Sequence, residues 1–353
     1  MKNLTVSLGE KSYDIIIERG IFNRIGEEIK KVYDGNKLVV VTDENLNRIY
    51  GKLLKEQLLN KGFSSEFIVV EPGEKSKSVE VLQEVYSKLL EFKVTRGDLI
   101  VAFGGGVVGD LTGFAAATFL RGVKYIQIPT SLLAQIDSSI GGKVAVNLKE
   151  GKNLIGNFYH PKKVIIDPEV LKTLPEEFLK DGMGEVIKYA CIKDEELFSV
   201  LESLHKDEEL MDKMDYIIYT CCNIKREIVE EDEMDLGIRM ILNFGHTLAH
   251  GIEKYFNYER YTHGEAVSLG IYHITKKSEE LALTEKGTAE KIKKLLENYG
   301  IQYRLPDMDM CKIKEIITLD KKNISGNINL ILLSNIGAAY IRKFTMEEID
   351  NIL

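Results

Sequence analysis

Three of the six histidines in the chain lie in one short part of the sequence. His246 and His250 are spaced i, i+4, which places both imidazoles on one face of a helix, and His263 follows shortly afterwards. Histidine titrates near neutral pH and is the commonest metal ligand in proteins. Zinc peptidases share the spacing but need a glutamate after the first histidine, where this chain has Thr247. The cluster indicates a metal or proton-transfer site of another kind, or histidines packed on an amphipathic helix.

A glutamate with two glycines just before it offers a further metal ligand. Glu185 lies near the start of an expected helix, in the segment Gly182-Met-Gly184-Glu185-Val-Ile-Lys188. With His246 and His263 it would form a Glu-His₂ set, a pattern that binds catalytic zinc and leaves coordination positions open for substrate. The alternative is a carboxylate that only interacts favourably with the dipole at a helix N-terminus. The sequence therefore predicts a metal site and leaves this alternative open.

Two cations stand where a solvated surface charge is not the obvious explanation. Lys225 falls within the apolar stripe of Ile218, Cys221 and Ile228, and a buried lysine is costly unless it meets an anion. Arg121 ends an expected helix just before Gly122, where a cation is also normal as a C-terminal cap. Lys225 is expected to meet an anion, whereas for Arg121 the cap remains an alternative.

A glycine-rich segment between an expected strand and an expected helix indicates a phosphate-binding loop. Its sequence is Phe103-Gly104-Gly105-Gly106-Val107-Val108-Gly109-Asp110. Glycines allow backbone N–H groups to approach a pyrophosphate at a helix N-terminus, and a side chain at Gly109 is expected to obstruct that approach. No acid follows at the usual distance for the ribose hydroxyls, so Asp43, at the end of an earlier strand, is the hypothesis for that role. A tight structural turn is the alternative.

Further loops combine glycine, small polar residues and lysine. They are the turn 71–77, the segment 129–143 that ends in Gly-Gly-Lys143, and Gly151-Lys152-Asn153. A lysine beside glycines indicates an ammonium held near an anion.

The pattern of elements predicts two domains. Strands are expected at the N-terminus and at 13–18, 38–42, 67–71, 99–103, 125–129 and 164–167, with helices at 78–92 and 111–120. Such alternation predicts a mostly parallel sheet with flanking helices, and the glycine-rich segment makes residues 1–175 an expected α/β dinucleotide-binding domain. Helices are then expected at 176–203, 210–231, 247–256, 265–283 and 288–299, with a small hairpin at 329–334 and 338–343. Residues 176–353 are therefore expected to form a mainly α-helical metal- and substrate-binding domain.

Composition excludes several classes of protein. The formal charge of −8 argues against a nucleic-acid binder, and no apolar run approaches the ~20 residues that span a bilayer. The N-terminus lacks the apolar core of a signal peptide. The four cysteines form no CxxC pair, which fits a reducing compartment. A cytoplasmic protein that contacts neither membrane nor nucleic acid is expected.

Taken together, these segments resemble the 3-dehydroquinate synthase family, within the sugar phosphate cyclases. The resemblance rests on six strings in the same order along the chain: Gly-Gly-Gly-Val-Val-Gly-Asp110, Gln-Ile-Asp-Ser-Ser-Ile-Gly-Gly-Lys143, Gly-Lys-Asn-Leu-Ile-Gly156, Gly-Met-Gly-Glu-Val-Ile-Lys188, Leu-Asn-Phe-Gly-His-Thr-Leu-Ala-His250 and His-Gly-Glu-Ala-Val267. It implies a shikimate-pathway enzyme that converts 3-deoxy-D-arabino-heptulosonate 7-phosphate to 3-dehydroquinate and phosphate. Transient oxidation, phosphate elimination, re-reduction and aldol closure would use catalytic NAD and one divalent metal, zinc or cobalt.

The resemblance also implies a role for individual residues. The metal ligands would be Glu185, His246 and His263. The catalytic and substrate-binding set would be Asp137, Lys143, Asn153, Lys188, Lys225, Arg239, Asn243 and His250, with Arg121 reaching the site of a neighbouring subunit in a homodimer. The NAD-binding set would be Asp43, Pro72, Gly73, Glu74, Lys75, Ser76, Lys77, Gly105, Gly106, Val107, Val108, Gly109, Asp110, Thr130, Ser131, Lys143, Lys152, Val170, Leu171, Lys172 and Thr173. Lys321 or Lys322 would complete the substrate site.

Three alternative functions remain at this point. Another sugar phosphate cyclase would share the metal ligands and NAD but close a different ring. A metal- and NAD-dependent polyol dehydrogenase would release NADH, but gives no reason for so many cations. An NAD-binding sensor without enzymatic activity gives no reason for the Glu-His-His set.

Overall fold

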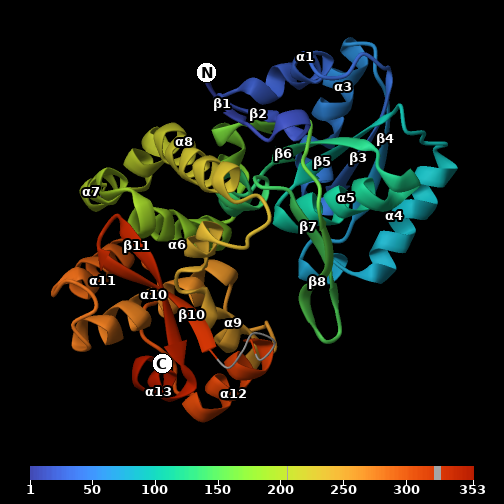
Figure 1. The fold of residues 1–353 in the computed structure, drawn as a ribbon. Coiled ribbons are helices and arrows are strands. Elements are labelled where there is room, and N and C mark those ends of the chain that lie inside the picture. The colour runs from blue at the N-terminus through green and yellow to red at the C-terminus, as the bar shows by residue number, and fades with distance from the viewer. Residues whose placement is uncertain (205, 322–326) are drawn as a thin grey trace. The chain divides into compact units, whose positions relative to one another are not determined.

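The computed structural model describes residues 1–204, 206–321 and 327–353 (Figure 1). The chain separates into two compact units. The first comprises Met1–Leu174 and Lys225–Met234, and the second comprises Pro175–Ile224 and Asp235–Leu353. The first unit thus includes a short segment from the second half of the chain, which the sequence did not indicate.

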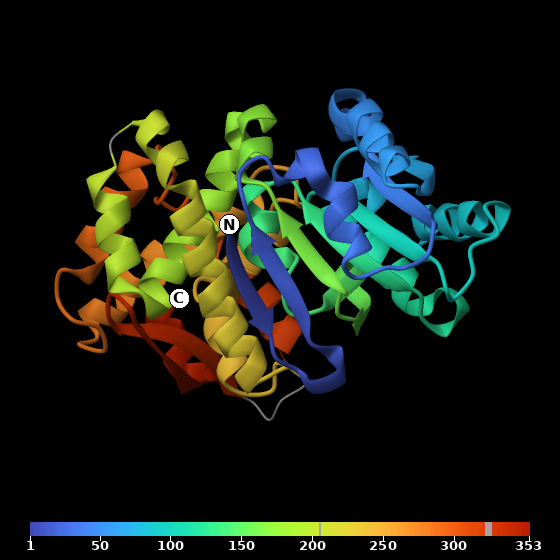
Figure 2. The same ribbon diagram turned by 90° about the horizontal axis from the view of Figure 1, so that it is seen from above.

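The first unit is built on a seven-stranded sheet in the order β1-β2-β9-β6-β5-β3-β4. The strands are β1 (Lys2–Val6), β2 (Tyr13–Ile17), β3 (Lys37–Asp43), β4 (Ser64–Val70), β5 (Leu99–Gly104), β6 (Lys124–Pro129) and β9 (Lys163–Ile166). All neighbours are parallel except β1 and β2, which lie in dark blue beside green β9 in Figure 2. The predicted fold class is confirmed, and each of these strands overlaps an expected one.

Helices cover both faces of this sheet because its central strands are apolar on both sides. Along β3, Val39 and Val41 pack into one core cluster, whereas Leu38 and Val40 pack into the other. The first cluster includes residues of α4 (Val79–Glu91) and α5 (Gly106–Thr118). The second includes residues of α1 (Ile25–Lys30) and α3 (Lys52–Asn60), while the short α2 (Glu44–Leu46) follows β3. The strand period of two residues thus separates the two cores.

The helix after the glycine-rich segment differs from the expected one at 111–120. Helix α5 already begins at Gly106, with extended Gly105 as its N-cap, and it ends at Thr118. A short 3-10 turn, η5 (Phe119–Arg121), follows, in which Leu120 and Arg121 have φ angles of 51° and 65°. The glycines misled the sequence-based boundary because glycine lowers helix propensity, although here they form the first turns of the helix.

The sequence also missed an antiparallel hairpin in the first unit. Strands β7 (Lys143–Leu148) and β8 (Gly151–Phe158) pair with each other, and Figure 1 shows them in green. Most of β8 is exposed and rich in glycine and asparagine, which are residues depleted in strands. The hairpin is anchored through β7, whose Val144 and Val146 are buried in the first core cluster and whose Asn147 N–H donates to the carbonyl oxygen of Lys77 at 2.8 Å.

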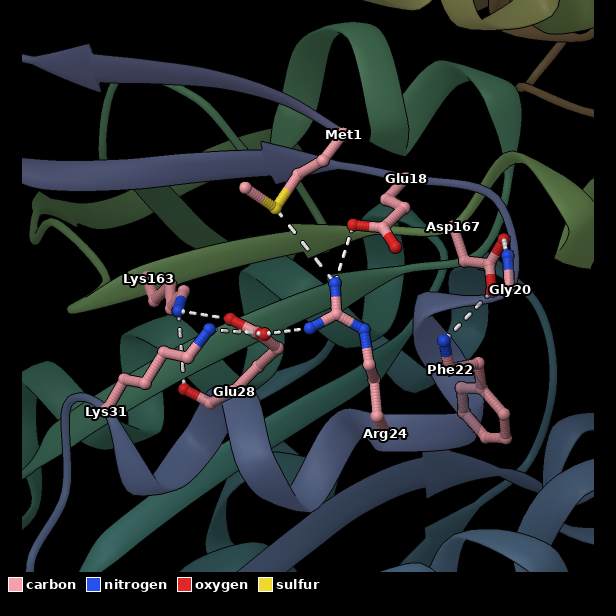
Figure 3. Close-up of polar contacts among 9 residues, drawn as sticks. All are labelled: Met1, Glu18, Gly20, Phe22, Arg24, Glu28, Lys31, Lys163 and Asp167. Carbon is pink, nitrogen blue, oxygen red and sulfur yellow. Dashed lines mark hydrogen bonds and ion pairs between the residues drawn. The ribbon is translucent and has the colours of Figure 1, made fainter.

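Two ionic contacts attach the N-terminal elements to strand β9 and the residue that follows it (Figure 3). The fully buried carboxylate of Glu28 on α1 accepts a 2.9 Å hydrogen bond from the Nζ of Lys163, and Arg24 and Lys31 also contact it. Asp167 accepts hydrogen bonds from the backbone N–H groups of Gly20 and Phe22 at 2.9 and 3.0 Å. Burial alone would raise the pKa of Glu28, but the hydrogen bonds and positive charges of Lys31 and Lys163 keep it below its usual value.

The second unit is mainly helical, as predicted. Its helices are α6 (Glu176–Lys193), α7 (Glu195–Ser203), most of α8 (Asp207–Glu231), α9 (His246–Tyr255), α10 (His263–Glu280), α11 (Thr288–Asn298), α12 (Met310–Lys321) and α13 (Met346–Ile352). The expected hairpin is confirmed as β10 (Asn327–Asn335) and β11 (Ala338–Thr345). The expected helix 176–203 is divided at Asp194, whose side chain caps α7 by accepting from the Leu197 N–H.

Helices α12 and α13 were not expected from the sequence. Among the described residues, no helix has the length and apolar character needed to cross a membrane.

Candidate active site

Three potential metal ligands converge in the second unit. Glu185 lies on α6, while His246 and His263 are the first residues of α9 and α10. The Nε2 atoms of His246 and His263 lie 3.4 and 3.6 Å from Oε1 of Glu185. Ligand atoms held ~2.1 Å from one ion in a tetrahedral arrangement lie about 3.4 Å apart, so these spacings suit a zinc-like ion.

The other ring nitrogen of each histidine also faces an acceptor. Nδ1 of His246 lies 3.1 Å from the carbonyl oxygen of Phe244, and Nδ1 of His263 lies 3.5 Å from Oε1 of Glu253. A proton on each Nδ1 leaves the Nε2 lone pair directed at Glu185. This is the tautomer that a metal-binding histidine needs, and such outer contacts are typical of metal sites.

The carboxylate of Glu185 is fully buried, yet neither of its oxygens makes a hydrogen bond within the described part of the chain. Its Oε2 forms an ion pair with Lys188 one turn along α6, whereas Oε1 faces the two histidines. Because Lys188 pairs with Oε2, the cost falls on Oε1, whose charge is buried without a hydrogen bond. A divalent cation beside Oε1 would offset that cost, so the donor set fits a metal.

The two histidines have different electrostatic surroundings. Burial and the nearby Lys188 hold the pKa of His246 well below its usual value, so this ring is neutral at pH 7. For His263, burial acts in the same direction, but the hydrogen bond and negative charge of Glu253, together with Glu185, raise its pKa to about 9. Metal binding would have to displace that proton, because only the neutral ring ligates.

Close backbone contacts at glycines bring the three helices together. A Cβ atom on Gly264 would lie 1.8 Å from the carbonyl oxygen of Asp181, and one on Gly184 would lie 2.4 Å from that of Gly264. A Cβ atom on Gly270 would lie 2.1 Å from the carbonyl oxygen of Gly245. These positions neighbour the three ligands: Gly184 precedes Glu185, Gly245 precedes His246 and Gly264 follows His263. The ligands converge because no side chain separates the backbones.

The predicted substrate residues of the second unit lie near the three potential ligands. Lys188 and His250 are one helical turn from Glu185 and His246, and the turn that carries Arg239 and Asn243 shortly precedes His246. Lys188 and Arg239 are 1% and 2% exposed, which is unusual for cations and implies nearby negative charge. The ring of His250 is exposed and its centroid lies 5.6 Å from that of His246. Asn243 is exposed at the end of the 3-10 turn η8 (Ile238–Asn243), which also carries Arg239.

In the first unit, Lys225 and Asp137 contact each other directly. The Nζ of Lys225, on helix α8, donates to the carbonyl oxygen and to Oδ1 of Asp137 at 2.6 and 2.8 Å. Asp137 belongs to a π-helical turn, η6 (Ala134–Ser138), and such turns are frequent at functional sites. The buried lysine therefore meets an anion, as its place on the apolar stripe indicated.

The residues expected to bind NAD gather at the carboxyl edge of the parallel strands. Asp43, Gly104 and Pro129 end β3, β5 and β6, the turn 71–77 follows β4, and η7 (Pro168–Thr173) follows β9. This edge is where open α/β sheets bind ligands. Thr130, at 5% exposure, also donates its backbone N–H to the Gly104 carbonyl oxygen.

Several of these residues have structural partners of their own. Asp43 caps α2 by accepting from the Leu46 N–H at 3.0 Å. The side chains of Val108, Val170 and Leu171 are buried, so only their backbone could meet a cofactor. The π-helical turn η3 (Asn47–Gly51) includes Tyr50, whose hydroxyl lies 3.0 Å from Oγ1 of Thr173.

Gly109 does not serve the purpose that the sequence suggested. A Cβ atom there would lie 2.9 Å from Oε1 of Gln127 on β6, so the residue allows α5 to pack closely on the sheet. A Cβ atom on Gly105 or Gly106 would instead meet the hydroxyl of Ser131 or Ser138, at 3.4 and 3.2 Å. The prediction that a side chain at Gly109 would obstruct a pyrophosphate is therefore wrong, because that side chain would meet Gln127.

Polar contacts join the remaining expected cofactor residues. Lys77, which is 6% exposed, forms an ion pair with Asp110, whose pKa is nevertheless raised by burial. Asn147 of β7 donates its side-chain amide to Oε1 of Glu74 in the 3-10 turn η4 (Glu74–Ser76) at 2.7 Å, and accepts from the Asn153 N–H at 2.8 Å. The structure thus links turn 71–77 to the hairpin that carries the predicted residues Lys143, Lys152 and Asn153.

Arg121 is not a simple C-terminal helix cap. Helix α5 ends three residues earlier, and both Arg121 and Leu120 adopt left-handed backbone angles. The Arg121 side chain is exposed and makes no hydrogen bond or ion pair with other described residues. Holding two non-glycine residues in this region costs roughly 1–3 kcal/mol each. The expected Lys322 lies outside the described residues, as does the side chain of Lys321.

Sequence reasoning missed two acidic residues at the metal centre. Asp181 accepts from the Gly264 N–H at 2.6 Å, and Glu253 contacts His263. Both side chains are less than a tenth exposed. The spacing of Glu253 from His246 and His250, i, i+4, i+7, would have shown that it shares their helix face.

Comparison with known proteins identifies relatives along the whole chain. The family models described as 3-dehydroquinate synthase N-terminal and C-terminal match residues 67–181 and 182–323. The 3-dehydroquinate synthase of Clostridium acetobutylicum is 55% identical over 348 residues, which is 99% of this chain and 98% of that protein.

Two solved structures are similar over their whole length. A 2-deoxy-scyllo-inosose synthase complexed with carbaglucose-6-phosphate, NAD⁺ and Co²⁺ matches with a TM-score of 0.88 and 23% identity, covering 99% of both chains. The 2-epi-5-epi-valiolone synthase of Streptomyces hygroscopicus with NAD⁺ and Zn²⁺ bound matches with the same TM-score and 25% identity, covering 98% of this chain and 96% of that one.

The glycine contacts give a direct test of how the ligands converge. Gly264→Ala should lower the free energy of unfolding by about 1–3 kcal/mol or more, because the new methyl group overlaps the backbone at Asp181. The variant should also retain less metal after dialysis, since α10 must move away from α6. Gly97→Ala is the matched control, because a Cβ there would lie 3.7 Å from its nearest neighbour. If Gly264→Ala matched this control in stability and metal content, the close approach would not matter.

Proposed function

The chain belongs to the 3-dehydroquinate synthase family, and we propose that Glu185, His246 and His263 are the metal ligands of its active site. Its activity is the conversion of 3-deoxy-D-arabino-heptulosonate 7-phosphate to 3-dehydroquinate and phosphate, a carbon–oxygen lyase reaction of the shikimate pathway. The observation that carries this conclusion is 55% identity along 99% of the chain. The relatives do not favour another cyclase, a polyol dehydrogenase or a non-enzymatic sensor.

NAD and one divalent metal, zinc or cobalt, are the cofactors. When bound, NAD accepts and returns a hydride, and the metal acts as a Lewis acid toward substrate oxygens. We assign the metal to the Glu-His-His set because its spacing, tautomers and unsatisfied carboxylate all suit an ion.

The cations are proposed to bind the phosphate and carboxylate of the substrate. Lys188 and Arg239 are buried, and Lys225 is buried beside Asp137. Charge-assisted hydrogen bonds from such groups are stronger than neutral ones, and burial increases the effect. The same role is proposed for Lys143, with Asn153 and Asn243 as uncharged partners. Because burying a cation is costly, the burial of Lys188, Lys225 and Arg239 indicates that they bind anionic groups.

Lys188 has a second function in this proposal. Its ammonium forms an ion pair with Oε2 of Glu185, so it stabilises the carboxylate while leaving Oε1 available to an ion. With an ion bound, part of that negative charge is neutralised and the ammonium can turn to an anionic substrate.

His250 is proposed to transfer a proton at the substrate hydroxyl that is oxidised. Its exposed ring lies one helical turn from the proposed ligand His246, where an imidazole can pass a proton between the substrate and solvent. A role limited to hydrogen bonding near the metal is the alternative.

NAD is proposed to bind along the carboxyl edge of the first unit's sheet. The N-terminus of α5 after Gly105 offers backbone N–H groups to a pyrophosphate. The turn 71–77, the segment 105–110, Thr130, Ser131, Lys152 and the turn 170–173 surround or extend this edge, and Asp43 is assigned to the adenosine side. This makes residues 1–175 the NAD-binding domain and residues 176–353 the metal- and substrate-binding domain.

The cellular setting completes the proposal. A cytoplasmic homodimer fits the acidic composition, the burial of Cys191, Cys221 and Cys222 without a disulfide, and the exposed Arg121. No nucleic acid or membrane partner is proposed.

The balance of cofactor and product distinguishes this reaction from a dehydrogenase. The wild-type enzyme should release one phosphate per product without net NADH, because the hydride returns to the substrate. A phosphate assay beside NADH absorbance measures both. His263→Ala should lose activity and metal by more than the ~10–100-fold typical of changes outside the ligand shell, whereas His273→Gln on the same helix should retain both. Stoichiometric NADH, or full metal content in His263→Ala, would contradict the assignment.

The role of Arg121 in a neighbouring subunit can be tested by mixing variants. Arg121→Ala should weaken substrate binding ~10–100-fold, as expected for a lost ionic hydrogen bond, and leave metal binding intact. Mixed with inactive Lys188→Ala, it should recover about one quarter of wild-type activity, because half of the dimers are mixed and each has one intact site. No recovery in verified mixed dimers would place Arg121 in the site of its own subunit.

A further inference from the structure

Helix α9 contributes a buried acid to the metal centre in addition to its ligand. His246, His250 and Glu253 are spaced i, i+4, i+7 and therefore share one helix face. The Glu253 side chain is 4% exposed, and its Oε1 lies 3.5 Å from Nδ1 of His263 on α10. One face of α9 thus carries the predicted ligand His246, and its Glu253 contacts the predicted ligand His263.

We propose that Glu253 is the positioning residue of the metal centre, which fixes the tautomer and ring orientation of His263 so that its Nε2 can ligate. This inference rests on the proposed metal site, but assigns a function to a residue outside it. Glu253 touches neither the predicted ion nor, by this proposal, the substrate, and acts only through His263.

The contacts of His263 support the proposal that Glu253 sets the tautomer of this ring. The imidazole of His263 has Glu253 at Nδ1 and Glu185 at Nε2, at 3.5 and 3.6 Å, so the ring lies between two carboxylates. A proton on Nδ1 donates toward Glu253 and leaves the Nε2 lone pair directed at Glu185. The opposite tautomer would direct an N–H at the ion position and leave a carboxylate facing a lone pair.

The two ligand histidines receive unequal support. His246 is held by the Phe244 carbonyl oxygen, two residues away, so its orientation follows from the local backbone. His263 begins a different helix, and its Nδ1 contact comes from the neighbouring helix α9. A carboxylate acceptor increases the basicity of the ring more than a carbonyl does. Glu253 therefore strengthens the ligand that is less constrained by its own chain.

A stabilising role alone does not account for this placement. A buried carboxylate costs free energy wherever it lies, and an apolar residue packed on this face would stabilise the helix contact at lower cost. The side chain faces one of the two imidazoles whose orientation decides whether the three proposed ligand atoms converge. The buried negative charge of Glu253 is explained if its function is to orient His263.

The test compares metal binding by isosteric and truncated variants. Glu253→Gln keeps the shape and an acceptor oxygen but removes the charge, whereas Glu253→Ala removes both. Zinc affinity, measured by competition with a chelator, should fall about 10-fold in Glu253→Gln and up to about 100-fold in Glu253→Ala. The visible absorption spectrum of the cobalt-loaded protein should change in both, because the geometry of one ligand is altered.

Glu279→Gln is the matched control. Glu279 is a partly buried acid on α10 that accepts a hydrogen bond from the backbone N–H of Ala289, far along the helix from His263. This variant should bind zinc as the wild type does. Far-ultraviolet circular dichroism of each metal-free variant verifies its fold before binding is compared.

The outcomes separate this inference from the proposed metal site. If the wild type binds zinc and both Glu253 variants bind it within twofold with unchanged cobalt spectra, the positioning role is wrong while the metal site stands. If the wild type and His263→Ala bind zinc equally, the metal site itself is wrong. Graded loss in Gln and Ala, with an unaffected Glu279→Gln, supports the inference.

Discussion

The close approach of three helix backbones is the constraint on which the metal centre depends. At Gly184, Gly264 and Gly270 a single added carbon would lie within 2.4 Å of a neighbouring carbonyl oxygen. Each contact adjoins a predicted ligand or joins the helices that carry the ligands. Without these contacts, Glu185 could not reach both imidazoles, because a carboxylate side chain is short. The glycines thus allow the helix backbones to approach closely enough for Glu185, His246 and His263 to bind one ion.

The charges around the proposed metal centre favour a cation. Glu185 is buried without hydrogen bonds within the described chain, Glu253 stands behind one imidazole, and Lys188 neutralises part of this charge. In the first unit, the carboxyl edge of the parallel strands collects residues from distant parts of the sequence, and Lys225 meets Asp137. The same acidic chain therefore combines buried carboxylates that suit a metal ion with buried cations that suit anionic groups.

Much of this could be predicted from the sequence, and the failures have physical causes. Periodicity gave the parallel strands and most long helices, and the histidine spacing indicated a shared face. The hairpin β7–β8 was missed because β8 is largely exposed and polar, although Val144 and Val146 of β7 are buried in the core and Asn147 adds polar contacts. A side chain at Gly109 was expected to obstruct a cofactor but would instead meet Gln127, because a glycine pattern does not reveal which atoms approach. Glu253 was missed because its partner, His263, lies on another helix.

The most direct test of the central claim is X-ray absorption at the zinc edge of the metal-loaded protein. The account predicts a first shell of nitrogen and oxygen at about 2.0–2.2 Å, with the outer scattering of two imidazoles and no sulfur. His246→Ala should reduce the imidazole contribution to one ring. A sulfur shell at about 2.3 Å, or a wild-type spectrum with fewer than two imidazoles, would contradict convergence of Glu185, His246 and His263 on one ion.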